Sequence, residues 1–210
     1  MKKIMFNDKY GLTQAVLEGR KTMTRRVVNI HDADEVGIWD APYITIYKDG
    51  RMLTDIMPTY KVGEEVAVAQ TYIEVYNQYG DWLEKRCEEI YTSPKALSGV
   101  AGWTNKMFVK ADLMPHRIRI TNIKVERLQD ISDEDVYKEG FRHEFVNNGW
   151  GNYANHEEAV LVYYDNVGRT KVISSRNPKE AFSFLIDKIS GKGTWGRDPW
   201  VFAYTFELVR

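Results

Sequence analysis

Residues 18–28 read Glu18-Gly19-Arg20-Lys21-Thr22-Met23-Thr24-Arg25-Arg26-Val27-Val28. Before this stretch, Leu12, Ala15 and Val16 recur at the spacing of one helix face. Gly19 then stands where a helix C-cap belongs. The β-branched end of the stretch is typical of a strand. The sequence therefore predicts a helix-to-strand corner, and basic residues cluster at that corner.

The basic cluster contrasts with the balanced charge of the whole chain. The 210 residues include 29 Lys plus Arg and 30 Asp plus Glu, for a formal net charge of −1. This excludes a uniformly basic nucleic-acid coat but not a local patch. Residues 1–28 alone hold seven basic and two acidic residues, a local charge of +5. A second basic group includes Arg117 and Arg119. A solvated surface is the ordinary alternative explanation of such clusters.

The cysteine content and the distribution of apolar residues limit the cellular compartments in which the protein is expected. The single cysteine, Cys87, excludes an internal disulfide. Residues 1–8 lack the apolar segment of a signal peptide. No apolar run approaches the ~20 residues that a membrane helix needs. We therefore expect a cytoplasmic protein that makes no membrane contact.

Further elements follow from short-range signals. Asp49-Gly50 predicts a hairpin between strands at 43–48 and 51–56. Residues 116–128 alternate as a strand, and the phase changes at Thr121-Asn122, which predicts a bulge. Residues 200–209 form a strand whose aromatic residues belong to a core. Helices are expected from Ser132 to Gly140 and from Asn177 to Gly191, the second with a buried stripe between 181 and 189.

Strands outnumber helices in this interpretation, and the helices occur singly. This favours an α+β, mainly β fold: a small antiparallel barrel with a few flanking helices. Residues 77–106 and 142–176 show no clear periodicity, apart from a candidate helix at 156–164. We interpret both segments as insertions into a single domain of residues 1–210.

Metal and cofactor motifs are missing from the sequence. It contains neither a Cys-x-x-Cys nor a His-Glu-x-x-His spacing. Gly191-Lys192-Gly193-Thr194 lacks the upstream strand and glycine of a phosphate-binding P-loop. We expect no metal site and no cofactor.

The spacing of Gly19, Lys21 and Arg26 resembles the Gly-x-Lys-x-x-x-x-Arg signature of the ASCH family, a branch of the PUA-like barrels. Phage and prophage proteins of this family carry similar text, in the same order, at residues 60–64, 119–128, 131–140 and 199–207. The resemblance covers roughly residues 3–28, 58–75, 107–141 and 178–209, and neither insertion. One departure is Ala69-Gln70-Thr71-Tyr72, where the phage relatives tend to have a charged Arg-Glu pair before Thr-Trp.

The resemblance implies a PUA-like barrel with a cleft suited to RNA or a modified nucleoside. Some small ASCH proteins hydrolyse the acetyl amide of N4-acetylcytidine with a lysine, a threonine and a glutamate. Lys21 and Thr24 match the first two residues, and Glu139 is the best match to the glutamate. Glu134 and Asp135 fit less well.

The residue types suit that chemistry. A threonine hydroxyl needs a base within hydrogen-bond reach to act as a nucleophile. A lysine serves as that base if burial or neighbouring arginines lower its pKa. The non-catalytic alternative is that Lys21 only neutralises phosphate or pairs with the acidic residues at 130–135, and that Thr24 is an ordinary strand residue.

Three functions stay open at this stage: binding of RNA or a modified nucleoside in a basic cleft, amide hydrolysis of an N4-acylated cytidine, and a phage-derived adaptor role. The sequence identifies no protein partner. The residues expected to bind the ligand are Gly19, Arg20, Lys21, Arg25, Arg26, Arg117, Arg119 and Trp195.

Overall fold

The computed structural model describes residues 1–30, 35–38, 42–89, 92–146, 156–165 and 167–209. Its α-helices are α1 (Leu12–Leu17), α2 (Tyr72–Glu89), α3 (Pro94–Leu97), α4 (Asp133–Lys138), α5 (Pro178–Ser190) and α6 (Thr194–Arg197). Short 3₁₀ turns lie at Asp8–Tyr10, Ala101–Trp103, Lys106–Phe108, Ala111–Leu113 and Leu128–Asp130. Together with the strands, they make a mixed α+β fold, which confirms the predicted α+β class. Helices are as prominent as strands, so the expectation of a mainly β fold is not confirmed.

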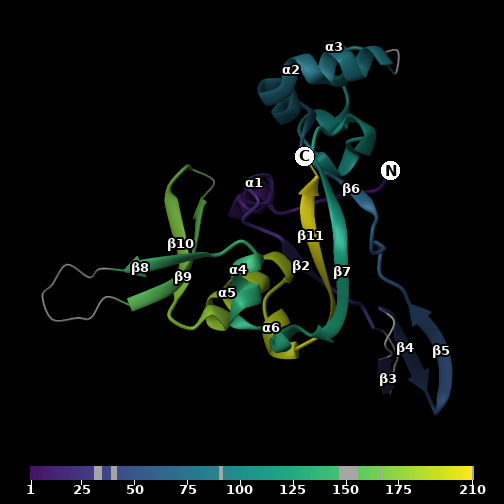
Figure 1. Ribbon diagram of the computed structural model, residues 1–210, viewed down its shortest axis with the longest axis vertical. Coiled ribbons are helices and arrows are strands. Elements are labelled where there is room, and N and C mark those ends of the chain that lie inside the picture. Colours follow the sequence, from purple (N-terminus) through teal and green to yellow (C-terminus); the bar gives the residue numbers. More distant parts are fainter. Residues whose placement is uncertain (31–34, 39–41, 90–91, 147–155, 166, 210) are drawn as a thin grey trace, which may run out of the picture.

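A five-stranded sheet runs through the middle of the molecule (Figure 1). Its order is β1 (Lys3–Ile4), β6 (Glu65–Val68), β7 (Arg117–Arg127), β11 (Trp200–Val209) and β2 (Met23–Val27). The pairings are antiparallel, except that β1 pairs with β6 in parallel. Thr205 lies opposite Asn122 and Phe206 opposite Ile120, so Thr121 is the extra residue of a bulge. The phase change in the sequence predicted this bulge correctly.

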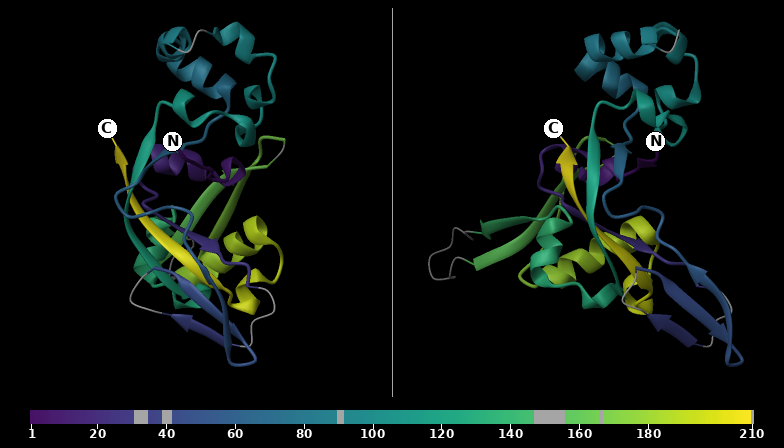
Figure 2. Two further views of the ribbon diagram at one scale, coloured as in Figure 1. Left: turned by 90° about the vertical axis from the view of Figure 1, so that its right-hand side faces the viewer. Right: turned by 45° about the vertical axis from the view of Figure 1, so that its right-hand side comes forward.

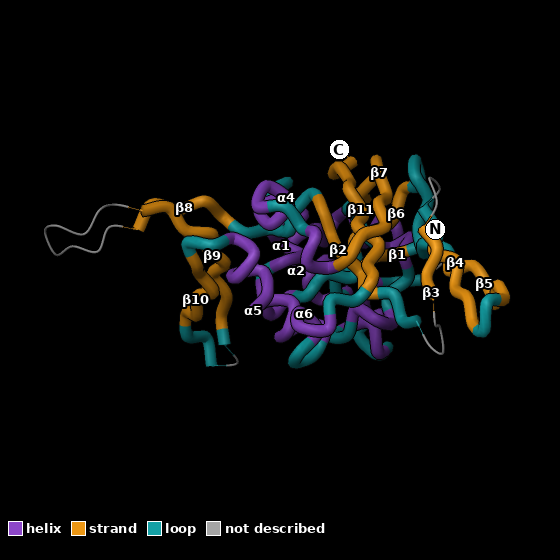
Figure 3. The backbone as a smooth tube through the Cα atoms, turned by 90° about the horizontal axis from the view of Figure 1, so that it is seen from below, coloured by secondary structure: helices purple, strands orange, loops and turns teal. Residues whose placement is uncertain are grey.

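Two three-stranded sheets extend from opposite sides of the central one (Figure 3). One has the order β10 (Thr170–Ser175), β9 (His156–Tyr164), β8 (Arg142–Val146). The other has the order β3 (Glu35–Ile38), β4 (Ile44–Lys48), β5 (Arg51–Ile56). Asp49 and Gly50 both have positive φ at the β4–β5 turn, which confirms the predicted hairpin.

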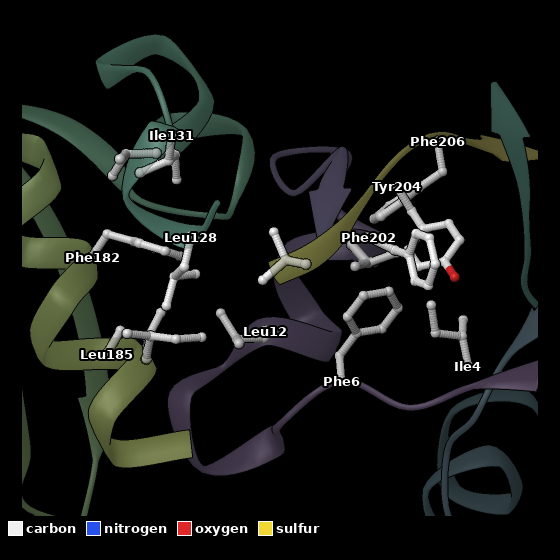
Figure 4. Close-up of a cluster of buried hydrophobic side chains, with 14 of the residues drawn as sticks. Ile4, Phe6, Leu12, Leu128, Ile131, Phe182, Leu185, Phe202, Tyr204 and Phe206 are labelled. Atoms are coloured by element: carbon white, nitrogen blue, oxygen red, sulfur yellow. The ribbon is translucent and has the colours of Figure 1, made fainter. Parts of the chain in front are cut away.

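The main hydrophobic core lies between the central sheet, α1 and α5 (Figure 4). Phe202, Tyr204 and Phe206 of β11 are buried, as their alternation predicts. On α5, Phe182 and Leu185 are buried, whereas Ile189, which belongs to the expected stripe, is 36% exposed. Asn177 caps α5 by accepting hydrogen bonds from two backbone N–H groups.

The expected barrel is not closed by hydrogen bonds among the described residues. β1 and β2 are the two edges of the five-stranded sheet and share no ladder in the part of the chain that is described. A side chain nevertheless joins the two edges, because Arg26 Nη2 of β2 donates to the carbonyl of Met5, next to β1, at 2.6 Å. The fold therefore brings β2 near the segment that follows β1.

Residues 77–106 correct the sequence-based interpretation, because they are mostly helical rather than irregular. The helical unit spans residues 72–113 and lies at the end of the molecule opposite β3–β5 (Figure 2). Its own small core includes Tyr72, Val75, Leu83 and Cys87. The buried positions of α2 begin at Tyr72, before the predicted insertion of residues 77–106, and a kink at Tyr79 interrupts their helical spacing. Both features obscure the periodicity.

The described parts of residues 142–176 also form regular strands, and the helix expected at 156–164 is wrong. His156–Tyr164 is β9, the middle strand of a sheet. Ala159 and Leu161 point to the main core, and β-branched and aromatic residues lie between and after them. Pairing with β8 and β10 decides the strand, and neither partner is recognisable from the short-range pattern. Residues 147–155 of this segment, including Asn147-Asn148-Gly149, lie outside the described residues.

Candidate functional site

Lys21 and Glu139 form a buried ion pair. Lys21 Nζ lies 2.5 Å from Glu139 Oε2 and donates a second hydrogen bond, of 2.8 Å, to the Glu139 backbone carbonyl. The two residues are 2% and 4% exposed. They are 118 positions apart in the chain, so only the tertiary fold brings them together.

The corner after α1 positions Lys21. Gly19 has φ +74°, and the next two backbone N–H groups both donate to the carbonyl of Ala15. This closes the helix with the left-handed glycine that the sequence predicts. The N–H of Thr22 then donates to the carbonyl of Lys138 at 2.9 Å. The corner is thereby tied to the end of α4, directly beside Glu139.

Glu139 follows the last residue of α4, a helix capped by the Ser132 hydroxyl. Gly140 has φ +110°, a conformation that favours glycine strongly. A Cβ atom there would lie 3.5 Å from the Cβ atoms of Ala15 and Lys21. The glycine therefore lets the end of α4 turn while it remains packed on the corner that carries Lys21.

Arg25 lies at the centre of a buried carboxylate cluster. Its guanidinium contacts Glu126 Oε1 (2.7 Å), Asp135 Oδ2 (2.9 Å) and Glu139 Oε1 (3.2 Å). The arginine side chain is 1% exposed. Glu139 thus lies between two cations, one on each carboxylate oxygen, and its position is fixed from both sides.

Burial and charge act in opposite directions on these groups. Burial lowers the pKa of Lys21, and the Glu139 charge only partly opposes it. For Arg25 burial also acts to lower the pKa, but the charges of Glu139 and Glu126 and the hydrogen bonds to Asp135 and Glu126 together outweigh it, and the pKa is raised. Arg25 therefore stays charged, while Lys21 is the cation whose proton is more easily lost.

A cavity of about 610 Å³ opens beside the ion pair. Its polar lining includes Lys21, Thr24, Arg25, Arg26 and Glu139. Its apolar lining includes Phe6, Leu12, Phe182 and Leu185, which are labelled in Figure 4. The volume falls within the range of about 300–1,000 Å³ that is typical of small-molecule sites.

Thr24 lies on β2 and is 6% exposed. Its backbone pairs with Tyr204 of β11, and its side chain lines the cavity. Its hydroxyl makes no hydrogen bond to any residue that the structure describes. Because this hydroxyl lies in the cavity wall and has no structural hydrogen bond of its own, it is available to a ligand.

The structure brings some of the predicted ligand-binding residues to the cavity and places others elsewhere. Gly19 shapes the corner without lining the cavity. Arg20 turns outward, where it pairs with Glu18 and donates to the Gly140 carbonyl. Arg117 and Arg119 lie at the far end of β7 and form exposed ion pairs with Glu65.

Trp195 is partly buried against the main core and does not line the cavity. Its ring packs edge-on against Phe182 at a centroid distance of 6.2 Å. Its backbone N–H donates to Asp187, and its carbonyl accepts from Gln129. Trp195 therefore lies apart from the cavity, and its expected role in base stacking stays a prediction.

Sequence reasoning missed several residues of the site. Phe6 faces the Lys21 ammonium at 5.9 Å, and Lys106 comes from the helical unit that we interpreted as an irregular insertion. Nothing in the local sequence distinguishes these two residues. Of the carboxylates around Arg25, Asp135 could have been found from the sequence, because it belongs to the acidic residues at 130–135 that were considered as partners of the basic cluster.

The described residues form neither a metal-binding cluster nor a membrane-spanning helix. Among the described residues, no group of three or more histidine, cysteine or acidic side chains is arranged to hold a metal ion. Within the same residues, no helix is both long and apolar enough to cross a membrane. Comparisons with protein-family models, with curated proteins and with solved structures yielded no match.

Proposed function

We propose that this protein binds a modified nucleoside in the 610 Å³ cavity and hydrolyses the amide of an N4-acylated cytidine. The observation that carries the proposal is the buried Lys21–Glu139 pair in the same cavity wall as the unbonded Thr24 hydroxyl. These are the three residues that resemble the lysine, threonine and glutamate of hydrolytic ASCH proteins. The resemblance implies all three residues, and the contact between Lys21 and Glu139 supports their assignment to one site.

In the proposed reaction, Thr24 Oγ1 attacks the amide carbonyl carbon and transfers its proton to neutral Lys21. The Lys21 amine contacts Glu139 and not Thr24 in the structure, so it has to turn toward Thr24 Oγ1 once the substrate is bound. The carbon–nitrogen bond then breaks, and Lys21 returns the proton to the departing amino group. Water next attacks the threonyl ester, gives one proton through Lys21 to Thr24, and releases the carboxylic acid. Base and acid catalysis of this kind contribute about 10²–10⁴-fold each. Glu139 orients the amine through its carboxylate and its carbonyl.

Burial supports this assignment of roles. A lysine at its ordinary pKa is almost fully protonated near neutral pH and is then a poor base. Desolvation of Lys21 favours the neutral amine, and the nearby positive charges of Arg25 and Arg26 act in the same direction. The Glu139 carboxylate prevents the opposite extreme by stabilising the ammonium form.

We also propose that the five-stranded sheet is a PUA-like barrel whose last gap, between β1 and β2, is occupied by the cavity. The order of the ASCH-like segments and the side-chain link from Arg26 to Met5 support this assignment. In such an arrangement, the helical unit and the β8–β10 sheet are additions to one domain.

The first test is an assay of the purified protein with N4-acetylcytidine, followed by chromatography of the cytidine released. We expect turnover without added metal. Failure to release cytidine from this compound, and from N4-propionyl or N4-benzoyl analogues, would contradict the hydrolytic function.

Replacement of Thr24 separates nucleophilic attack from simple binding. We expect Thr24→Val to reduce the rate by at least about 10²-fold, because it removes the hydroxyl and keeps the shape. Thr24→Ser should retain most activity, since it keeps the hydroxyl. The measurement is kcat for each variant, together with mass spectrometry of acid-quenched enzyme to detect an acyl adduct. Equal activity of Thr24→Val and wild type would exclude the threonine as nucleophile.

The pH dependence follows from the direction of the Lys21 shift. Since the neutral amine is the base, kcat/KM should rise with pH through the pKa of Lys21, which lies below its ordinary value of 10.5. Glu139→Gln removes the charge that raises this pKa, so the rising limb should move to lower pH in that variant. Measurement of pH–rate profiles for both proteins tests this. A limb that stays in place or moves to higher pH would show that Lys21 is not the titrating base.

A further inference from the structure

The lining of the cavity contains more basic side chains than its ion pairs neutralise. Its charged lining consists of Lys9, Lys21, Arg25, Arg26 and Lys106 against Asp8 and Glu139, that is, five cations and two carboxylates. Lys21 pairs with Glu139, and Lys106 pairs with Asp8 at 2.7 Å. Arg25 is neutralised by the buried carboxylates. Lys9 and Arg26 remain, and neither has a carboxylate partner among the described residues.

Contacts within the protein position the Arg26 side chain and leave donors of its guanidinium available to a ligand. Its Nη2 donates to the Met5 carbonyl, and its guanidinium carbon lies 5.8 Å from the centre of the Phe6 ring. These contacts fix the side chain and still leave most of its five N–H donors unused. A planar guanidinium with free donors recognises phosphate oxygens in pairs. Its side chain is exposed, so the group reaches the solvent side of the cavity.

The same Phe6 ring connects this outer cation to the inner ion pair. Lys21 Nζ lies 5.9 Å from the ring centre, close to the 5.8 Å of Arg26. A single small ligand can therefore reach both cations. Of the cavity lining, Thr24 and the Lys21–Glu139 pair are buried, whereas Arg26 and Lys9 are exposed. Lys9 Nζ lies 5.9 Å from the centre of the Tyr10 ring and has no carboxylate partner among the described residues.

We infer that the cavity takes a nucleoside 5′-phosphate, with the acylated base toward Thr24 and the phosphate bound by Arg26 and Lys9. This inference rests on the proposed function and specifies its substrate class. Arg26 and Lys9 then determine specificity for nucleotides over nucleosides, and they take no part in bond breaking.

The observations favour a mononucleotide over an RNA chain. An extended RNA needs a basic groove that follows several phosphates. Arg117 and Arg119, the other basic residues expected to bind, lie at the far end of β7 and are paired with carboxylates. The cavity lining itself offers two cations without a carboxylate partner, Lys9 and Arg26, which suits one phosphate rather than a run of several.

Calorimetric titration with cytidine 5′-monophosphate and with cytidine tests the inference without requiring turnover. We expect the wild-type protein to bind the monophosphate at least about ten-fold more tightly, as one charge-assisted hydrogen bond provides. Arg26→Gln and Lys9→Gln should each weaken binding of the monophosphate by about ten-fold and leave cytidine binding unchanged. Arg51→Gln, which removes an exposed arginine on β5 away from the cavity, is the matched control.

Each outcome has a distinct meaning. Equal affinity for the two compounds, or no binding of either, would overturn the phosphate site. A ten-residue oligocytidine that binds more tightly than the monophosphate, with a steep loss of affinity in salt, would overturn it in favour of RNA. Tight monophosphate binding that depends on Arg26, combined with no release of the acyl group from N4-acetylcytidine 5′-monophosphate, would support the site and refute the proposed hydrolysis instead.

Discussion

Lys21→Met is expected to reduce the hydrolysis of N4-acetylcytidine by about 10³-fold or more, because it removes the proposed base while filling nearly the same volume. The substitution also leaves Glu139 with Arg25 as its remaining ion-pair partner. Since breaking a buried ion pair destabilises proteins, the variant should unfold at a lower temperature than the wild type. The measurements are kcat with saturating substrate, and thermal unfolding.

A double variant distinguishes a catalytic Lys21 from a structural one. Lys21→Met combined with Glu139→Gln removes both charges of the pair and should recover part of the lost stability. We expect its activity to remain as low as that of Lys21→Met. If activity returned together with stability, Lys21 would have only a structural role, as an ion-pair partner, and would not be the catalytic base.

Arg25→Met is expected to cause the largest loss of stability, roughly 3–5 kcal/mol. The reason is that Glu126, Asp135 and Glu139 all contact this one buried guanidinium. Without it, several carboxylates repel each other in a region with little solvent. For a chain of this length, 1 kcal/mol corresponds to about 2–4 °C in Tm, so the expected decrease is on the order of 10 °C.

Arg26→Met is the matched control for stability, since it alters the neighbouring arginine, which is exposed and has no carboxylate partner among the described residues. Its Tm should change by no more than a few degrees. The difference between the two variants should shrink in acid. Arg25 holds the pKa of Asp135 below its usual range despite burial, so this contribution is present above the ordinary carboxyl pKa and is lost as the pH falls through the lowered one. Urea unfolding at neutral and at acidic pH measures the effect, and equal stability of the two variants would refute the role given to Arg25.

The elements that the sequence predicted well are those set by short-range chemistry. Gly19 ends α1 with positive φ, Asp49-Gly50 makes the β4–β5 turn, and Ser132 caps α4. Each depends on the conformational freedom of a glycine or on a side chain that bonds its own backbone, and both are readable from a few neighbouring residues.

The elements that it predicted poorly depend on distant partners. β9 is a strand because β8 and β10 pair with it. In α2, the buried positions face a small core that includes Leu113, beyond the predicted insertion. Closure of the barrel was expected from the number of strands, yet pairing of the edges depends on backbone positions that no local pattern reveals.

The features of the candidate site can likewise be divided into those set by local sequence and those set by distant partners. The sequence by itself determined the corner and the presence there of Lys21, Thr24, Arg25 and Arg26, because helix termination and strand propensity are local. Only the tertiary structure decided that Arg25 turns into the interior while Arg26 stays at the surface, and that Glu139 meets Lys21 from 118 residues away. The physical reason is that charge partners and burial are properties of packed elements. They decide which cation in a basic cluster becomes structural, which has a lowered pKa, and which remains free for a ligand.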